Sequence, residues 1–292
     1  MNDNLNGAGV VYVAVGRECI DEALRSASSL KRHMPDLPVT LFANEPLSYP
    51  AVDEVVLIRE DRYRRGAKVG YMARSPYPRT LFLDTDTYVC GELFRLFSLL
   101  DYFDIAAAHG PRRTPDYYSQ FREEYDLVPH DFCQLNSGVI LFKKSPQLEK
   151  CLARWNDLNI QNPRLEVVGD QLGFRRAVFE SGLKLVVLPS EYNCMANHMG
   201  YAHGHVHILH SWSPQLEAIA GIINSYKGMR IFKANLGGNW FTLFRDDRKV
   251  KRLIFWRRLP RFLMRTLGLR LLLLMGRKVD ARGWRRQTRR KR

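Results

Sequence analysis

The sequence lacks the features of membrane-spanning and disulfide-stabilised proteins. No apolar run approaches the roughly 20 residues that a transmembrane helix needs, and the polar residues 1–9 do not resemble a signal peptide. The five cysteines are scattered, odd in number and form no Cys-x-x-Cys pair. This pattern predicts reduced thiols instead of a zinc cluster or a disulfide framework. We therefore expect a cytoplasmic protein.

Two common phosphate-binding motifs are also absent. No Gly-x-Gly-x-x-Gly follows the first apolar run at residues 10–15, which disfavours a classical dinucleotide site. The absence of Gly-x-x-x-x-Gly-Lys-Ser/Thr disfavours a P-loop NTPase. A phosphate that is held through a divalent cation stays open as an alternative.

A strongly basic body is absent as well, although the chain has a net charge of +15. Residues 248–292 hold 18 of the 45 Lys and Arg and one acid, Asp280, so this tail alone has a charge of +17. The other 247 residues combine 27 basic with 29 acidic side chains and are nearly neutral. The predicted organisation is therefore a body at 1–247 followed by a basic tail at 248–292.

The body shows an alternation of short apolar runs with helical patterns. Runs typical of buried strands lie at residues 10–15, 39–42, 55–58, 81–83, 105–108, 139–142 and 183–188. Helical spacing of apolar residues occupies 20–34, 92–100 and 145–158, and another helix opens near residue 170. Strands that alternate with helices form βαβ units. We predict an α/β fold with a single Rossmann-like domain and a mainly parallel sheet.

Two carboxylates directly follow the fourth predicted strand. Asp84 and Asp86 stand after Leu81-Phe82-Leu83, and ligands in open α/β sheets bind beyond the carboxyl ends of the strands. Side chains two residues apart on extended backbone point the same way, so the pair could converge on one cation. Oxygen ligands suit Mg²⁺ or Mn²⁺, which would hold a diphosphate. An ordinary turn explains the two residues equally well.

Later stretches offer partners for this pair. Asn136, Ser137 and Gly138 open a strand, where an amide and a glycine allow close contact with a ligand, although a plain turn explains them too. Asp170 opens a helix and fits an N-cap as well as a binding site. His210 ends a short alternating strand, and among the clustered histidines it alone stands where a metal ligand is expected.

The segment at residues 110–134 is long, polar and aromatic, and includes Tyr117, Tyr118, Phe121 and Tyr125. A partly buried aromatic stripe on an ordinary helix and loop explains this composition. A lid or acceptor wall beside an active site explains it too, because functional residues gather on loops. The sequence leaves both interpretations open.

In their order and spacing, these pieces resemble the GT-A glycosyltransferases, most closely glycosyltransferase family 8, which includes glycogenin and bacterial lipopolysaccharide galactosyltransferases. The resemblance covers roughly residues 9–215. Six short motifs carry it: Leu-Phe-Leu-Asp84-Thr-Asp86, Lys68 upstream of it, Asn136-Ser137-Gly138, Asp170-Gln171, Tyr192-Asn193 and His210.

The resemblance implies a retaining hexosyltransferase that moves a sugar from a nucleotide diphosphate donor, with UDP expected, to a hydroxyl of a glycan or lipid-linked acceptor. Asp84, Asp86 and His210 match the ligands of the cation, usually Mn²⁺. Mixed carboxylate and imidazole ligation also favours Mn²⁺ over Mg²⁺.

The same resemblance places a set of residues around the donor, namely Ala14, Val15, Lys68, Asp84, Asn136, Ser137, Gly138 and Asp170. Ala14 and Val15 match the site where the base and ribose dock through backbone groups. Gln171 matches the residue beneath the anomeric carbon and is, with Asp170, a candidate catalytic residue. An amide is a poor nucleophile, so we expect the acceptor hydroxyl to attack on the face that the phosphate leaves.

One departure from the family concerns the diphosphate. The family usually continues from the histidine as His-aromatic-x-Gly-x-x-Lys-Pro-Trp, whereas this chain has His210-Ser-Trp-Ser-Pro-Gln. The lysine that binds the diphosphate is missing, and Lys227 and Arg230 are candidates to replace it.

Two other functions compete with glycosyl transfer. A sugar-nucleotide pyrophosphorylase has a related sheet, but Val15-Gly16-Arg17-Glu18 is a poor match to its Gly-rich loop. A non-catalytic membrane or nucleic-acid binder that acts through the tail belongs to a different class.

The tail at 248–292 interleaves Arg with apolar and aromatic residues such as Trp256 and Phe262. This pattern is typical of an amphipathic helix that lies on an anionic membrane, and a packed C-terminal helix with a disordered basic end is the alternative. Because the body is nearly neutral, nucleic acid is not an expected partner. We expect a peripheral protein on the inner face of the membrane.

Overall fold

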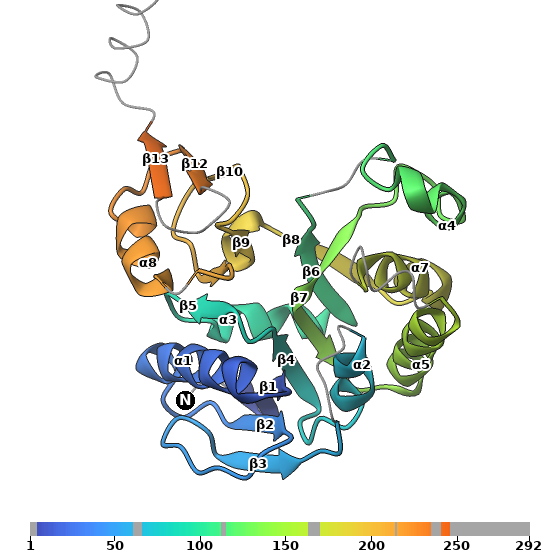
Figure 1. Cartoon of the computed structure of the whole chain (residues 1–292), viewed down its shortest axis with the longest axis horizontal. Helices are drawn as coiled ribbons and strands as arrows, with labels where there is room; N and C mark the ends of the chain where they lie inside the picture. The colour runs from blue at the N-terminus through green and yellow to red at the C-terminus, as the bar shows by residue number, and fades with distance from the viewer. Residues whose placement is uncertain are drawn as a thin grey trace, which may run out of the picture. The chain divides into compact units, whose positions relative to one another are not determined.

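A seven-stranded sheet runs through the protein in the order β3-β2-β1-β4-β7-β6-β8 (Figure 1). The computed structural model describes residues 5–60, 66–111, 115–162, 170–213, 215–234 and 241–245. The strands are β1 (Ala8–Ala14), β2 (Val39–Ala43), β3 (Glu54–Leu57), β4 (Arg79–Leu83), β6 (Ile105–His109), β7 (Leu135–Lys143) and β8 (Leu185–Leu188). All neighbours pair in parallel except β7, which is antiparallel to β4 and β6. The predicted α/β class with a mainly parallel sheet is confirmed.

Helices cover both faces of this sheet (Figure 1). One face packs on α1 (Arg17–His33) and α3 (Phe94–Phe97), and the other on α2 (Ala67–Met72), α5 (Pro146–Gln161) and α7 (Gln171–Ser181). Residues of β1 alternate between the two cores, so the whole strand is buried. This burial on both sides explains why the predicted strands are continuous apolar runs without polar alternation.

Local signals set the ends of the longer helices. Ser145 caps α5, since its hydroxyl accepts a hydrogen bond from the backbone N–H of Leu148 at 3.1 Å, and Pro146 follows at the first helical position. Gly182 ends α7 with a φ of 67°, a left-handed conformation that glycine adopts without strain.

Two small sheets stand beside the central one (Figure 1). The first has the order β5 (Thr87–Val89), β11 (Ile208–His210) and β9 (Cys194–Met195). The second has the order β10 (Gly200–Ala202), β12 (Arg230–Ala234) and β13 (Phe241–Arg245), and α8 (Leu216–Asn224) packs with these strands in a shared core. The predicted strand that ends at His210 is confirmed, but it belongs to a small sheet.

Other expectations meet the structure only in part. The helix predicted at 92–100 is the short α3 followed by a 3-10 turn, η2 (Ser98–Asp101). The tail at 248–292 and the predicted boundary after residue 247 lie outside the described residues. Within the described part of the chain, no helix has the length and apolar character required to cross a bilayer.

Candidate metal and donor site

The Asp84–Asp86 pair lies at the carboxyl end of β4, as the sequence predicts. Residues 84–87 form a turn into β5, in which the backbone N–H of Thr87 donates to the carbonyl of Asp84 at 3.3 Å. Strand β5 pairs antiparallel with β11, and Thr87 stands opposite His210. The backbone N–H of Ser211 donates to the carbonyl of Asp86 at 2.9 Å, so this ladder holds His210 beside the acidic turn.

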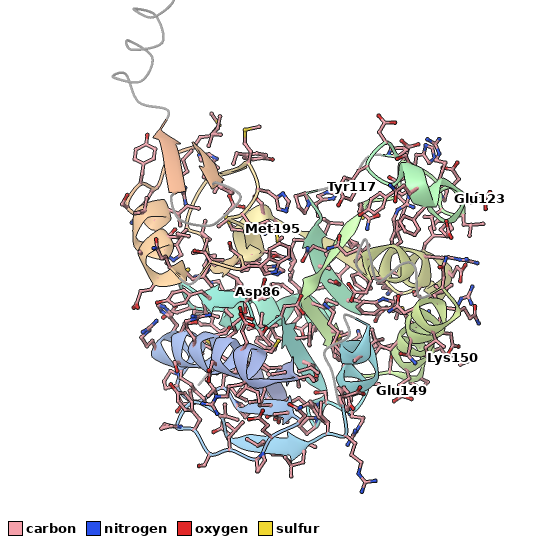
Figure 2. All side chains as sticks on the ribbon, viewed as in Figure 1. Asp86, Tyr117, Glu123, Glu149, Lys150 and Met195 are labelled. Carbon is pink, nitrogen blue, oxygen red and sulfur yellow. The ribbon has the colours of Figure 1, made fainter. Side chains whose placement is uncertain are left out.

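Asp84, Asp86 and His210 converge as a set of three metal-ligating side chains. Their ligand atoms all lie within 4.8 Å of one another, and the described residues contain no second group of this kind. Nε2 of His210 lies 3.2 Å from Oδ1 of Asp86 and 4.0 Å from Oδ2 of Asp84. Two carboxylates and one imidazole form a donor set that suits Mn²⁺. Figure 2 shows Asp86 beside β5, and Met195 on β9, the strand paired with β11 on its other side.

A pair of buried amides sets the orientation of the His210 ring. The side-chain nitrogen of Asn193 donates to Oδ1 of Asn136 at 2.8 Å, which leaves the Asn193 oxygen to accept from Nδ1 of His210 at 2.9 Å. Because Nδ1 then carries a proton, Nε2 is the ring nitrogen that faces the carboxylates, and it can give its lone pair to a metal once its own proton is released. The ring nitrogen and the residues present therefore fit a cation at this position.

Asp84, Asp86 and His210 also shift one another's pKa values. Burial raises the pKa of Asp84 above its ordinary value, although the Lys68 ammonium opposes this shift. Burial works in the same direction on Asp86, but the charge of His210 and its hydrogen bond outweigh burial and lower the pKa of Asp86. For His210, burial favours the neutral ring, yet the Asp86 carboxylate prevails and raises the pKa.

Lys68 of α2 connects this cluster to Asp170. Its Nζ lies 2.9 and 3.1 Å from the two carboxylate oxygens of Asp84 and 3.4 Å from Oδ2 of Asp170. It also donates to the backbone oxygen of Ser137 at 3.1 Å. All of these side chains except Asp84 are buried. A single buried ammonium therefore balances two carboxylates at the end of β4.

Asp170 stands at the N-cap position of α7, but its side chain does not cap the helix. Its Oδ1 instead accepts a hydrogen bond from the hydroxyl of Ser137 at 2.8 Å. The N-cap interpretation is thus right about the backbone position and wrong about the side chain, which joins the site.

The antiparallel direction of β7 brings Asn136, Ser137 and Gly138 to the aspartates. Because β7 runs opposite to β4, its beginning lies at the end of β4, and the N–H of Asp84 donates to the carbonyl of Gly138 at 2.8 Å. A Cβ atom on Gly138 would lie 2.1 Å from Cε1 of His210. Only glycine leaves room for the His210 ring here.

Ala14 and Val15 are buried at the end of β1. The parallel register, in which Val11 stands opposite Phe82, places the ends of β1 and β4 at the same edge of the sheet. Ala14 and Val15 therefore lie at the sheet edge that carries the acidic pair, and their contact with a base and ribose stays a prediction.

Gln171 is the first residue of α7 and lies by the ends of the aromatic segment. Its carbonyl accepts from Nε2 of Gln134 at 3.2 Å, and a Cβ atom on Gly110 would lie 3.4 Å from its Oε1. The N–H of Gly110 donates to the carbonyl of Gln134 at 2.8 Å, which closes the neck of the segment at residues 110–134. This neck adjoins Gln171.

Most of the aromatic stripe is buried. Tyr118, Phe121 and Tyr125 pack with Leu172 of α7 in a small core, which supports the interpretation as an ordinary helix and loop with a buried stripe. The segment forms the 3-10 turn η3 (Ser119–Phe121) and α4 (Arg122–Asp126). Figure 2 shows Tyr117 and Glu123 in this segment, apart from the β9 strand that carries Met195.

Sequence reasoning missed Arg175, which anchors this segment to α7. The side chain is buried, and its guanidinium donates to the backbone oxygens of Tyr125, Val128, Pro129 and Phe132 at 2.6 to 3.4 Å. Burial lowers its pKa from the ordinary value. An arginine on the apolar face of a predicted helix was the available signal, because such a charge needs buried partners.

A chain of buried hydroxyls beneath the acidic turn was missed as well. The hydroxyl of Tyr12 lies 3.0 Å from that of Ser26, which lies 2.8 Å from that of Thr87. Thr87 Oγ1 donates to the carbonyl of Asp84 at 2.8 Å. Ser26 on the buried face of α1 breaks the apolar pattern, and this break was the signal for the network.

Candidates for the missing diphosphate lysine have different environments. Arg230 is buried, and its guanidinium donates to the carbonyls of Gly204 and Gly228 at 2.5 and 3.0 Å. Because these bonds occupy the Arg230 guanidinium within the second small sheet, Arg230 is not a good candidate for binding the phosphates. Lys227 is exposed and stays a candidate.

Neither a protein-family model nor a curated protein matches the sequence. Among solved structures, the chain is similar to the glycosyltransferase GlyE of Streptococcus pneumoniae TIGR4, with 20% identity and a TM-score of 0.49 over 65% of this chain and 48% of that one. It is also similar to the galactosyltransferase LgtC, with 14% identity and a TM-score of 0.48 over 70% and 87% of the two chains. Mouse xyloside xylosyltransferase 1 follows, with 16% identity and a TM-score of 0.46 over 70% and 96%.

The match to GlyE spans less than half of that protein's length. With TM-scores below 0.5 and identities of 20% or less, these likenesses carry no argument about the activity of this chain. The function must be argued from the site.

Proposed function

We propose that this chain is a metal-dependent retaining glycosyltransferase of the GT-A type, similar to family 8, that moves a hexose from a UDP-sugar to a hydroxyl of a glycan or lipid-linked acceptor. One observation carries the proposal. Asp84, Asp86 and His210 form a candidate cation site at the carboxyl end of β4, and Asp170 lies beside it through Lys68. This edge of an α/β sheet is where nucleotide ligands bind.

In this proposal one set of residues would bind the nucleoside diphosphate of the donor, and another set would bind its sugar. Asp84, Asp86 and His210 would hold Mn²⁺ or Mg²⁺, which when bound supplies a Lewis acid for the leaving diphosphate. Asn193 keeps the His210 ring oriented through its 2.9 Å contact. Ala14 and Val15 would offer backbone groups for the base and ribose, and residues 136–138 of β7 and Asp170 would offer polar groups for the sugar.

The contacts of Asp170 support front-face attack by the acceptor. One of its oxygens accepts from Ser137, and the other lies 3.4 Å from the Lys68 ammonium. Both contacts stabilise the carboxylate and lower its nucleophilicity, and the amide of Gln171 is a poor nucleophile. The acceptor hydroxyl would attack the anomeric carbon on the face that the diphosphate leaves, and the departing phosphate oxygen would take the hydroxyl proton. The Gln171 oxygen would steady the positive charge on the sugar. A trapped sugar adduct on Asp170 or Gln171, or an inverted product, would contradict this.

A screen of nucleotide sugars tests the proposal. We expect the purified chain with Mn²⁺ to release nucleoside diphosphate from one UDP-sugar, and EDTA to abolish the release because the cation is lost. A parallel incubation with sugar phosphate and nucleoside triphosphate serves as the control. Formation of a nucleotide sugar in that control would favour a pyrophosphorylase, and no turnover of any donor would contradict the enzyme proposal.

We also propose that residues 248–292 hold the protein on the anionic inner face of the membrane. The support is the charge of +17 in a stretch that also carries aromatic and apolar residues. Deletion of residues 248–292 should leave donor hydrolysis unchanged and remove the salt-sensitive part of binding to anionic vesicles, measured by co-sedimentation. Undiminished salt-sensitive binding of the truncated protein would refute a membrane role for the tail.

A further inference from the structure

The second small sheet carries exposed apolar side chains on its outer face. Met199, Tyr201, Met229 and Ile231 expose 74%, 62%, 47% and 47% of their surface. The antiparallel register places Tyr201 directly opposite Ile231, and directly opposed side chains have Cβ atoms about 4.5–5.5 Å apart. Met199 and Met229 stand two residues before them, just outside the ends of β10 and β12. We call these four side chains the apolar face.

The opposite side of β10 and of the described part of β12 packs in the core. Ala202 and Phe232 alternate with the exposed residues and pack with α8. Arg230 is buried on the same side and bonded to backbone oxygens. Because one side already packs on the protein, the apolar face is a second surface, and contiguous exposed patches of this kind mark interaction sites.

Charge identifies the kind of partner. Residues 192–245, which include the sheet and α8, contain one acidic side chain, Glu217. Lys227 is exposed near the start of β12. The chain also leaves this sheet through β13 and continues into the tail, which holds 18 basic residues. Glu191, directly before this stretch, also reaches the sheet, because its Oε1 accepts from the backbone N–H of His203 at 2.6 Å. An apolar surface that the chain joins to so basic a tail fits the interface of an anionic bilayer, which attracts basic residues and accepts Tyr, Met and Ile side chains.

We propose that the apolar face inserts into the interfacial region of an anionic lipid bilayer. A second copy of this chain is the less suitable occupant, because that contact would not use the 18 basic residues that follow this sheet in the chain. The contact orients the body on the membrane independently of the tail. It does not depend on glycosyl transfer, since membrane binding needs no substrate.

Vesicle binding of the full-length protein tests the inference. The probe is vesicles of phosphatidylcholine with phosphatidylglycerol, and co-sedimentation is measured at low and high salt. High salt screens the basic tail, so the remaining binding reports apolar insertion. The variant Tyr201→Ser/Ile231→Ser should bind about tenfold more weakly at high salt, because binding scales with the apolar area buried. The loss at low salt should be smaller.

A matched control removes exposed apolar side chains elsewhere. Leu57 and Tyr102 expose 59% and 75% of their surface outside this sheet, and Leu57→Ser/Tyr102→Ser should bind like the wild type. If Tyr201→Ser/Ile231→Ser shows no cooperative thermal unfolding and is therefore not folded, vesicle binding of Met199→Ser/Met229→Ser is measured instead and becomes the decisive test. Binding by the decisive variant equal to the wild type at both salts overturns the inference. The inference is also overturned if the decisive variant changes its oligomeric state in analytical ultracentrifugation but binds vesicles like the wild type. That result would assign the apolar face to contact with a second copy.

Discussion

Asp86→Asn should reduce Mn²⁺-dependent donor turnover by at least about 100-fold, because replacing even an outer-shell partner of a metal commonly costs 10- to 100-fold. The amide preserves the shape of the side chain and removes the negative charge that faces His210 at 3.2 Å. Calorimetric titration with Mn²⁺ should show a matching loss of affinity. Turnover of the UDP-sugar that the screen identifies gives the second readout.

Asp157→Asn is the control for this experiment. Asp157 is an exposed acid on α5, and the same chemical change there should leave both readouts at the wild-type level. If Asp86→Asn binds Mn²⁺ and turns over the donor like the wild type, the three side chains do not form the cation site. Mn²⁺ affinity that is lost without any loss of turnover would separate the metal from the reaction.

Lys68→Met should destabilise the fold by about 3–5 kcal/mol, the usual effect of removing one partner from a buried ion pair. The lost ammonium lies 2.9 Å from Asp84 and 3.4 Å from Asp170, and both carboxylates would lose their compensating charge. Chemical denaturation measures the free energy of unfolding. Donor turnover should fall as well, because the carboxylates of Asp84 and Asp170 repel each other when the Lys68 ammonium no longer lies between them.

Two further variants make this prediction specific. Arg154→Met breaks the half-exposed pair with Glu180 and should cost less than about 1 kcal/mol. Lys68→Met/Asp170→Asn should recover part of the lost stability, because one carboxylate becomes neutral, while turnover stays low. Equal destabilisation by Lys68→Met and Arg154→Met would show that the Lys68 ammonium does not stabilise the site.

Contacts within the site depend on strand direction and on bonds between residues far apart in the chain, which no short sequence pattern predicts. The antiparallel direction of β7 brings Gly138 to the backbone of Asp84, whereas the alternating pattern alone predicts parallel strands. Likewise, the resemblance assigned Asn136 to the donor sugar, but Oδ1 of Asn136 accepts from Asn193, which in turn orients His210. Whether the Asn136 side chain also reaches a sugar stays a prediction.

The sequence by itself determined the alternation of strands and helices, the place of Asp84 and Asp86 at a strand end, and the separation of a neutral body from a basic tail. These properties depend on neighbours along the chain, because burial on both faces of a sheet requires continuous apolar runs. Only the tertiary structure decided that Lys68 balances Asp84 and Asp170, and that four apolar side chains share one exposed face. Such contacts depend on strand order, direction and register, which join residues far apart in the chain.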